Sequence, residues 1–236
     1  MKTPHTYLSP NPYPGRGILL GLHSDAAHAV VAYFIMGRSE NSRNRIFVTE
    51  GSGIRTQAYD PAKLVDPSLV IYAPVRIYGG NTIVTNGDQT DTIWEFLSEG
   101  KTFEAALRTR TFEPDAPNFT PRISGIVTKT ALRSITYKLS ILKSDEGRDY
   151  ACQRFFYEYD TPIAGEGHLI HTYRTDGTPI PAFAGEPARV AVSGSVDAFS
   201  KTLWNALNTE NRVALFVRYI SVTTGETQTR IINRWQ

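Results

Sequence analysis

The chain has 236 residues, of which 41% are hydrophobic and 20% are charged, and its formal net charge at pH 7 is +2. Such a composition is typical of a folded globular protein and argues against intrinsic disorder. The nearly neutral charge, without a long basic run, disfavours a nucleic-acid partner, because nucleic-acid binders present a concentrated positive surface.

The single cysteine, Cys152, excludes an intramolecular disulfide and a cysteine-rich zinc site, and it is compatible with a reducing compartment. No stretch approaches the roughly 18 apolar residues of a membrane span, and the first residues lack the apolar core of a signal peptide. We therefore expect a cytoplasmic protein without a membrane partner.

The N-terminal half reads mainly as strands. Residues 1–14 contain four prolines and are expected to form an extended N-terminal arm, because each proline disfavours helix at the preceding residue. Strand 27–36 is apolar on both faces, which indicates burial on both sides. It is expected to form a hairpin with strand 17–22 through the polar turn at 23–25. Further strands are expected at residues 45–50, 69–78 and 82–85.

Helical spacing first appears after residue 88, where Thr90 and Asp91 can cap a helix that Gly100 ends. Later in the chain, Ser195 is expected to cap a helix whose apolar residues repeat every three or four positions as far as Leu207. The remaining expected elements are a short helix at 103–108, strands at 123–127, 132–143 and 152–159, a connection at 161–187, and a hairpin of strands 213–222 and 227–235.

This order of elements predicts an α+β fold, in which helices lie outside two stacked, mainly antiparallel sheets, and not a repeating βαβ unit. No linker divides the chain, so we expect residues 1–236 to form a single domain. Hydrophobic edge strands are compatible with a homo-oligomer.

The segment 37–45, GRSENSRNR, concentrates three arginines in nine residues with almost no apolar content. Across the chain, 18 arginines outnumber 7 lysines. A planar guanidinium matches phosphate or carboxylate oxygens two at a time, which a lysine ammonium cannot do. This loop therefore predicts an anionic ligand, and a small phosphorylated molecule is the first hypothesis.

Four segments together resemble the archaeal-type IMP cyclohydrolases. They are YPGRGILLG at 13–21, GRSENSRNR at 37–45, RIYGGNTIVTNGDQTDTI at 76–93 and NFTPRI at 118–123. The resemblance implies the four-layer αββα sandwich of the N-terminal nucleophile hydrolases, in agreement with the predicted element order. Met1 opens the chain, however, so a terminal Cys, Ser or Thr nucleophile is not expected.

The activity that the resemblance implies belongs to de novo purine biosynthesis. It is the dehydrative ring closure of 5-formamidoimidazole-4-carboxamide ribotide (FAICAR) to inosine monophosphate (IMP). No cofactor, metal or covalent intermediate is required for this reaction. The alternative hypothesis is a non-catalytic purine-nucleotide-binding or regulatory protein on the same scaffold, which would bind the ribotide without turning it over.

The resemblance also assigns residues. Arg16, Arg38 and Arg45 are implied to line the pocket, with Arg45 near the reacting groups and the other two on the 5′-phosphate. Tyr72 is implied to act in proton transfer or positioning. The alternatives are a solvated surface ion pair for each arginine and an ordinary strand aromatic for the tyrosine.

The turn formed by Asn86, Gly87 and Asp88 precedes the helix that begins near residue 88, so its amides suit an anion or a polarised carbonyl. Its alternative is a plain helix cap. Glu113 is implied to be the catalytic carboxylate, with Asp115 as its competitor and a surface loop as the alternative. Arg122 is implied either to bind substrate or to pair with Glu113.

Two other patterns do not predict a binding site. The pair His168 and His171 lacks a third nearby ligand and is interpreted as a coincidence of sequence, not a zinc site. The string Gly165-Glu166-Gly167 lacks the spacing of a nucleotide-binding loop, so neither ATP nor NAD is expected.

Overall fold

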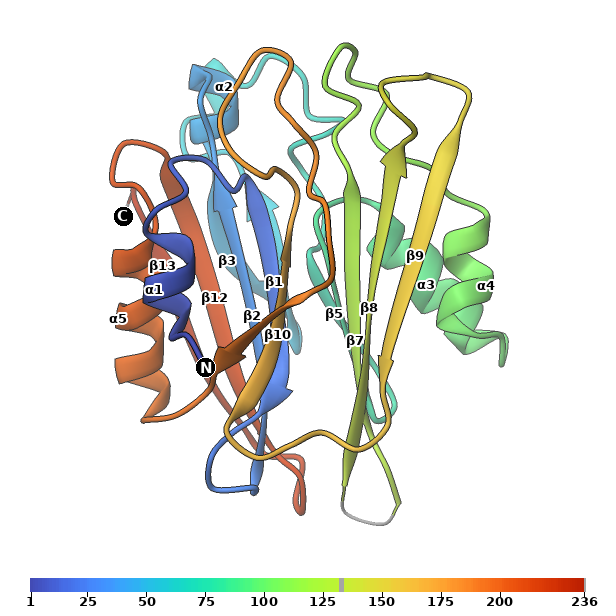
Figure 1. Ribbon diagram of the computed structural model, residues 1–236, viewed down its shortest axis with the longest axis vertical. Coiled ribbons are helices and arrows are strands. Elements are labelled where there is room, and N and C mark those ends of the chain that lie inside the picture. The colour runs from blue at the N-terminus through green and yellow to red at the C-terminus, as the bar shows by residue number, and fades with distance from the viewer. Residues whose placement is uncertain (132–133, 236) are drawn as a thin grey trace.

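The computed structural model describes residues 1–131 and 134–235, in which two antiparallel sheets stack face to face (Figure 1). One sheet has six strands in the order β11-β10-β1-β2-β12-β13, and the other has seven in the order β3 to β9. The six-stranded sheet comprises β1 (Arg16–Leu22), β2 (His28–Met36), β10 (Glu166–His171), β11 (Ala188–Ala191), β12 (Arg212–Ser221) and β13 (Thr227–Asn233). The seven-stranded sheet comprises β3 (Ile46–Glu50), β4 (Gly53–Gln57), β5 (Val75–Tyr78), β6 (Asn81–Thr85), β7 (Arg122–Lys129), β8 (Ile135–Ser144) and β9 (Cys152–Tyr159).

Helices cover the outer face of each sheet. Helices α1 (Pro4–Leu8) and α5 (Val196–Ala206) lie on the six-stranded sheet, and α3 (Gln89–Ser98) and α4 (Phe103–Arg108) lie on the other (Figure 1). Two shorter helices, α2 (Glu40–Arg43) and the 3₁₀ helix η1 (Pro61–Lys63), belong to connecting segments. The predicted α+β class with a four-layer αββα order is therefore confirmed.

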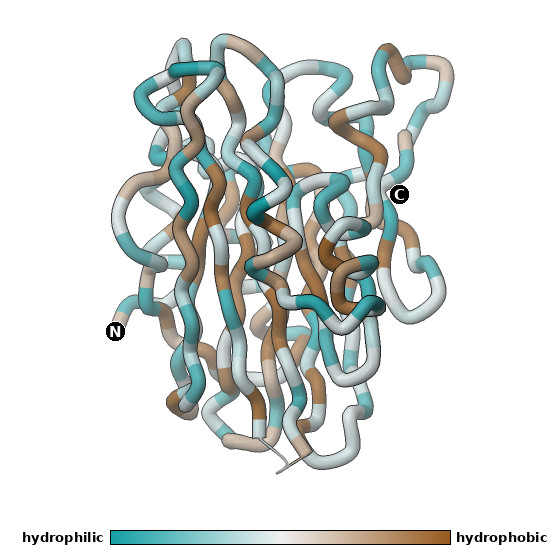
Figure 2. The backbone as a smooth tube through the Cα atoms, turned by 90° about the vertical axis from the view of Figure 1, so that its right-hand side faces the viewer, coloured by the Kyte–Doolittle hydropathy of each residue, from teal (hydrophilic) through white to brown (hydrophobic). Residues whose placement is uncertain are grey.

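Strand β2 explains why its sequence is apolar throughout. It lies between β1 and β12 in the sheet, and every residue of the strand after His28 is buried. Val31 and Ile35 pack between the sheets, whereas Val30 and Phe34 pack in the layer that contains α5. Hydrophobic residues accordingly concentrate along the strands, and hydrophilic residues gather in the loops (Figure 2).

The two sheets approach closely where β1 crosses β7. A Cβ atom on Gly125 would lie 2.9 Å from Leu20 Cδ1, so this glycine permits the contact. At another edge, Asn233 joins β13 to β3, since its side chain accepts from Phe47 N at 2.8 Å and donates to Phe47 O at 3.1 Å. These contacts fix how the strand ends from the two sheets meet.

Leu20 is fully buried between the sheets, so Leu20→Ala should create a cavity there. We expect it to lower the free energy of unfolding by about 2–5 kcal/mol, because lost transfer energy and an unfilled cavity add. Denaturant unfolding of Leu20→Ala beside Val65→Ala, at a position that is 85% exposed, measures this. Equal stability of the two variants would contradict the inter-sheet position of Leu20.

The N-terminal segment corrects one prediction. Residues 4–8 form α1 and are not extended, because Thr3 accepts a hydrogen bond from Thr6 N and Pro4 occupies the first turn, where proline suits a helix. Leu8 is fully buried against the layer formed with α5. The expectation of an extended arm is wrong for these residues, because Pro4 starts a helix and does not prevent one.

Several strands also differ from expectation. The connection predicted at 161–187 contains β10, and β4 and β11 were not predicted. In the predicted strand 69–78 only Val75–Tyr78 forms a strand. Pro67 begins a turn just before the predicted strand, and Pro74 directly precedes Val75. The predicted start of the next strand at 132–133 lies outside the described residues. Across the described ranges, no helix is long and apolar enough to cross a membrane.

Candidate active site

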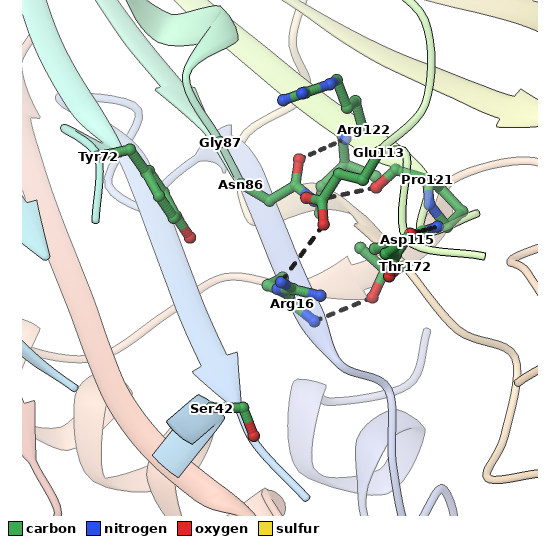
Figure 3. Close-up of polar contacts among 12 residues, drawn as sticks. Arg16, Ser42, Tyr72, Asn86, Gly87, Glu113, Asp115, Pro121, Arg122 and Thr172 are labelled. Carbon is green, nitrogen blue, oxygen red and sulfur yellow. Dashed lines mark hydrogen bonds and ion pairs between the residues drawn. The ribbon is translucent and has the colours of Figure 1, made fainter. Parts of the chain in front are cut away.

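Several of the residues predicted from sequence meet at one end of the sandwich, where strands of both sheets begin or end (Figure 3). Arg16 is the first residue of β1, and Arg122 is the first residue of β7. Asn86 follows the last residue of β6, which pairs with β7. Stacking of the sheets therefore brings together side chains that are far apart in the sequence.

Glu113 lies at the centre of this group and is 2% exposed. Its Oε2 is 3.6 Å from Arg16 Nη2, and its Oε1 accepts a hydrogen bond from Asn86 Nδ2 at 3.3 Å. The Asn86 carboxamide also donates to Pro121 O at 2.9 Å and accepts from Ile123 N at 2.8 Å. These backbone contacts fix the Asn86 side chain, which in turn orients the carboxylate.

Electrostatics place Glu113 in a range suited to proton transfer. Burial raises the pKa of Glu113 to about 7, against the opposing effect of the Arg16 and Arg122 charges. For Arg16, burial is the largest effect and lowers the pKa, but Glu113 and three neighbouring tyrosines together outweigh it, so the pKa is raised. A carboxyl group that titrates near neutral pH can both accept and return a proton.

Arg45 precedes β3 and is 1% exposed. Its Nε donates to Ser42 O at 2.8 Å, but its Nη1 has no hydrogen-bond partner among the described residues. Arg16 Nε is also buried and has no hydrogen-bond partner among the described residues. Burial lowers the pKa of the Arg45 guanidinium, with Tyr72 opposing and Arg16 adding to the effect. Buried donors of this kind cost free energy, which an anionic or carbonyl ligand would recover.

Tyr72 lies beside these arginines, and its hydroxyl points toward the side on which Arg16 and Glu113 lie (Figure 3). It is 5% exposed, and its hydroxyl is 2.8 Å from that of Tyr33 on β2. Burial raises the pKa of Tyr33, with a further contribution from Tyr72. Tyr33 therefore keeps its proton and can donate it to Tyr72.

The other predicted arginines occupy different surroundings. Arg38 forms an ion pair with Asp176, donates to Gly177 O at 3.0 Å, and lies over the Tyr13 ring. Its side chain is 36% exposed, so it sits at the rim of the group, where it joins segment 37–45 to segment 174–181.

Arg122 donates to Asp88 Oδ1 at 2.6 Å and to Gln89 Oε1 at 2.8 Å, so its ion-pair partner is Asp88 and not Glu113. Asp88 also pairs with Arg110. The negative charge at the turn 86–88 is therefore the half-exposed carboxylate of Asp88 itself, at the start of α3. A Cβ atom on Gly87 would lie 2.7 Å from Arg122 Nη1, so this glycine permits the arrangement.

The geometry favours Glu113 over Asp115 as the functional carboxylate. Asp115 accepts from Thr120 N at 2.6 Å and from the Thr120 hydroxyl, contacts that close its own loop. It does influence the group, because its charge contributes to the raised pKa of Glu113.

A hollow of about 630 Å³ lies between the β3–β4 turn and α3, and Arg16, Arg45 and Glu113 do not line it. It is lined in part by Tyr72, Arg76, Asp88 and Trp94. Its volume is in the range of small-molecule sites. Tyr72 lines this hollow and is also an electrostatic neighbour of Arg16 and Arg45.

A family model described as "IMP cyclohydrolase-like protein" matches residues 13–226. The chain belongs to this family. The match contains all four segments on which the resemblance was based, and the resemblance is confirmed.

Two proteins named IMP cyclohydrolase are similar to this chain. The one from Methanopyrus kandleri is 32% identical over 165 residues, which is 68% of this chain and 75% of that protein. The one from Methanothrix thermoacetophila is 29% identical over 119 residues, which is 49% of this chain and 57% of that protein.

In this member of the IMP cyclohydrolase-like family, three tyrosines join the group that sequence reasoning did not single out. They are Tyr13, Tyr33 and Tyr173, and each is an electrostatic neighbour of Arg16 or Arg45. Tyr13 belongs to the first family segment, and Tyr33 is a hydroxyl in an otherwise apolar strand, so each had a weak signal. Tyr173 lies in a segment predicted as a connection and had none.

The histidines at 168 and 171 point to different neighbours. His168 Nδ1 is 2.7 Å from the Tyr137 hydroxyl of the opposite sheet, whereas His171 Nε2 is 3.0 Å from the Tyr7 hydroxyl of α1. Residues three apart on a strand face opposite sides, so this pair does not chelate a metal.

Proposed function

We propose that this chain closes the pyrimidine ring of FAICAR to form IMP, as a single domain and without a cofactor. One observation carries the proposal: a buried carboxylate, Glu113, is held by Arg16 and Asn86 beside buried guanidinium donors that have no hydrogen-bond partner in the described part of the chain. Membership of the IMP cyclohydrolase-like family supports it. The alternative of a non-catalytic nucleotide binder gains no support from the names of the relatives.

The reaction needs the carboxamide nitrogen to attack the formyl carbon. The formyl oxygen then gains two protons, one from each nitrogen of the forming ring, and leaves as water. Glu113 accepts the proton from the carboxamide and returns it to the oxygen, because its pKa of about 7 suits both steps.

Arg45 stabilises the oxygen as charge develops on it in the tetrahedral intermediate. Its Nη1 is a preorganised donor in a water-poor site, where such an interaction is strongest. Arg16 fixes Glu113, and with Arg38 at the rim it contributes positive charge for the 5′-phosphate. Because Arg45 and Glu113 are almost fully buried, entry of a ribotide requires movement of the loops that cover them.

The direct test is to incubate the purified protein with FAICAR and follow IMP formation by ultraviolet absorbance against the spontaneous rate. We expect a clear acceleration that is unchanged by prior removal of metals with a chelator. Binding of IMP in calorimetry without acceleration would instead establish the non-catalytic binder.

Tyr72→Phe is expected to lower kcat by about 10–100-fold, because it removes the hydroxyl that relays a proton or orients the substrate. The fold should persist with a loss of about 1–3 kcal/mol, since the buried Tyr33 hydroxyl loses its partner. Steady-state kinetics and thermal unfolding of the same preparation measure both effects.

The matched control is Tyr150→Phe, at a position that is 83% exposed. It removes the same hydroxyl from the surface and should leave both kcat and stability unchanged. Full turnover in Tyr72→Phe would remove Tyr72 from the proposed chemistry.

A further inference from the structure

Three side chains that can bind a metal converge at the turn between β1 and β2, at the opposite end of β1 from Arg16. They are His23, Asp25 and His28, and their ligand atoms all lie within 4.8 Å of one another. Asp25 Oδ2 is 3.0 Å from His23 Nδ1 and 2.8 Å from His28 Nδ1. Adjacent ligands in a tetrahedral zinc site are about 3.3 Å apart, as follows from zinc–ligand distances of about 2.0–2.2 Å. The three atoms need only a small adjustment to share one cation.

Hydrogen bonds assign the protonation of His23. Its Nε2 is 3.0 Å from Gly194 O, a carbonyl that can only accept, so Nε2 carries a proton. Its Nδ1 is 3.2 Å from Asp25 N, a backbone amide that can only donate, so Nδ1 presents a lone pair. In metal-binding histidines an outer carbonyl likewise holds the nitrogen that does not bind the metal.

Asp25 Oδ2 lies beside the same nitrogen, 3.0 Å from His23 Nδ1. A positive charge shared by these two atoms, either a proton on an imidazolium or a metal ion, makes the contact favourable. A metal ion bound there would take over the Nδ1 lone pair that now accepts from Asp25 N.

Asp25 is oriented for this role by the backbone. Its Oδ1 accepts from Ala27 N at 2.7 Å and from His28 N at 3.2 Å. The second oxygen, Oδ2, is thereby turned toward the two imidazoles. The side chains of His23, Asp25 and His28 are 11%, 40% and 27% exposed, so an ion can reach them from solvent.

We propose that His23 Nδ1, Asp25 Oδ2 and His28 Nδ1 bind one divalent cation of the zinc type, with water as the fourth ligand. Two imidazole nitrogens and a carboxylate oxygen are ligands that Zn²⁺ accepts readily in tetrahedral geometry. Binding displaces the His28 Nδ1 proton that now bonds to Asp25. The site clamps the hairpin and takes no part in catalysis, because β1 separates it from Arg16 by roughly 20 Å at 3.3 Å per residue.

The test uses metal-stripped full-length protein titrated with Co²⁺, which reports tetrahedral coordination by its visible absorption. We expect one equivalent to bind. Free Zn²⁺ at about a hundredfold above its Kd should raise the melting temperature by about 5–10 °C. The variants Asp25→Asn and His28→Asn should each weaken binding at least tenfold, whereas His5→Asn, at an exposed histidine, should bind normally.

Asp25→Asn retains Oδ1 as the acceptor for Ala27 N and His28 N, so the turn should survive in this variant even if His28→Asn proves unstable. Absence of Co²⁺ binding to the wild type would overturn the proposal, and so would equal affinity in Asp25→Asn. Because the readouts are spectroscopic and thermal, the result is independent of whether the protein turns over FAICAR.

Discussion

Glu113→Gln is expected to lower kcat by about 10²–10⁴-fold, because the amide keeps the shape of the carboxylate and can still accept from Asn86 but cannot carry a proton. Asn86 and Arg16 remain in place, so substrate affinity should change much less than turnover. Single-turnover kinetics separate the chemical step from binding. Loss confined to KM would contradict an acid–base role.

Asp115→Asn is the matched control, because it changes the neighbouring carboxylate in the same way. It weakens the contacts with Thr120 and should lower stability more than turnover. If Asp115→Asn loses turnover while Glu113→Gln retains it, the functional carboxylate is Asp115.

Glu113→Gln should also alter how the free energy of unfolding depends on pH. Folding raises the pKa of Glu113 from 4.5 to about 7, so the folded state holds this proton more tightly than the unfolded chain. The resulting contribution to stability is fully present below pH 4.5 and is lost as pH rises through 7. By pH 8 the wild type should have lost up to about 3 kcal/mol from this source, and Glu113→Gln should lose none of it. Urea unfolding between pH 5 and pH 8 measures the difference.

Local patterns were sufficient for much of the fold. The β1–β2 hairpin and α4 follow from apolar spacing and turn residues, and the structure confirms them. Helix α1 could not be predicted from local patterns, because Pro4 is compatible with both an extended arm and a helix start. Only the burial of Leu8 decides between them. Strand β10 was missed because its short apolar run is surrounded by glycine and proline.

The sequence predicted several residues of the candidate site but not their arrangement in space. Family segments brought out Arg16 and Arg45, and Glu113 was assigned from its distance to the segment at 118–123. The individual roles of these residues stay predictions. Their convergence depends on the stacking of β1 against β7, which no local pattern encodes. The partner of Arg122 could not be chosen from sequence for the same reason, since Asp88 and Glu113 are both near it only in the folded chain.

The burial of Arg45 has a cost for the ligand-free protein. Arg45 Nη1 has no hydrogen-bond partner within residues 1–131 and 134–235, so the guanidinium loses hydration that these residues do not replace. The lowered pKa of Arg45 has the same origin, because burial disfavours its charged form. Binding sites commonly keep such a destabilising group when the ligand needs it.

Arg45→Met should therefore stabilise the protein while it removes activity. We expect the free energy of unfolding to rise by about 1–2 kcal/mol, since a flexible apolar side chain of similar length fills the same space. We expect kcat/KM to fall by at least about 100-fold, the effect of removing one oxyanion donor. Saturating IMP should raise the melting temperature of the wild type but not that of the variant.

Arg43→Met distinguishes this effect from a general effect of removing an arginine from the loop. Arg43 donates to Gly37 O at 2.9 Å and to Asn211 Oδ1 at 3.0 Å, so its replacement removes satisfied hydrogen bonds. It should lower stability and leave turnover within a few-fold of wild type. If Arg45→Met is destabilised like Arg43→Met and keeps its turnover, the Arg45 guanidinium serves the fold, and the oxyanion must be stabilised by another group.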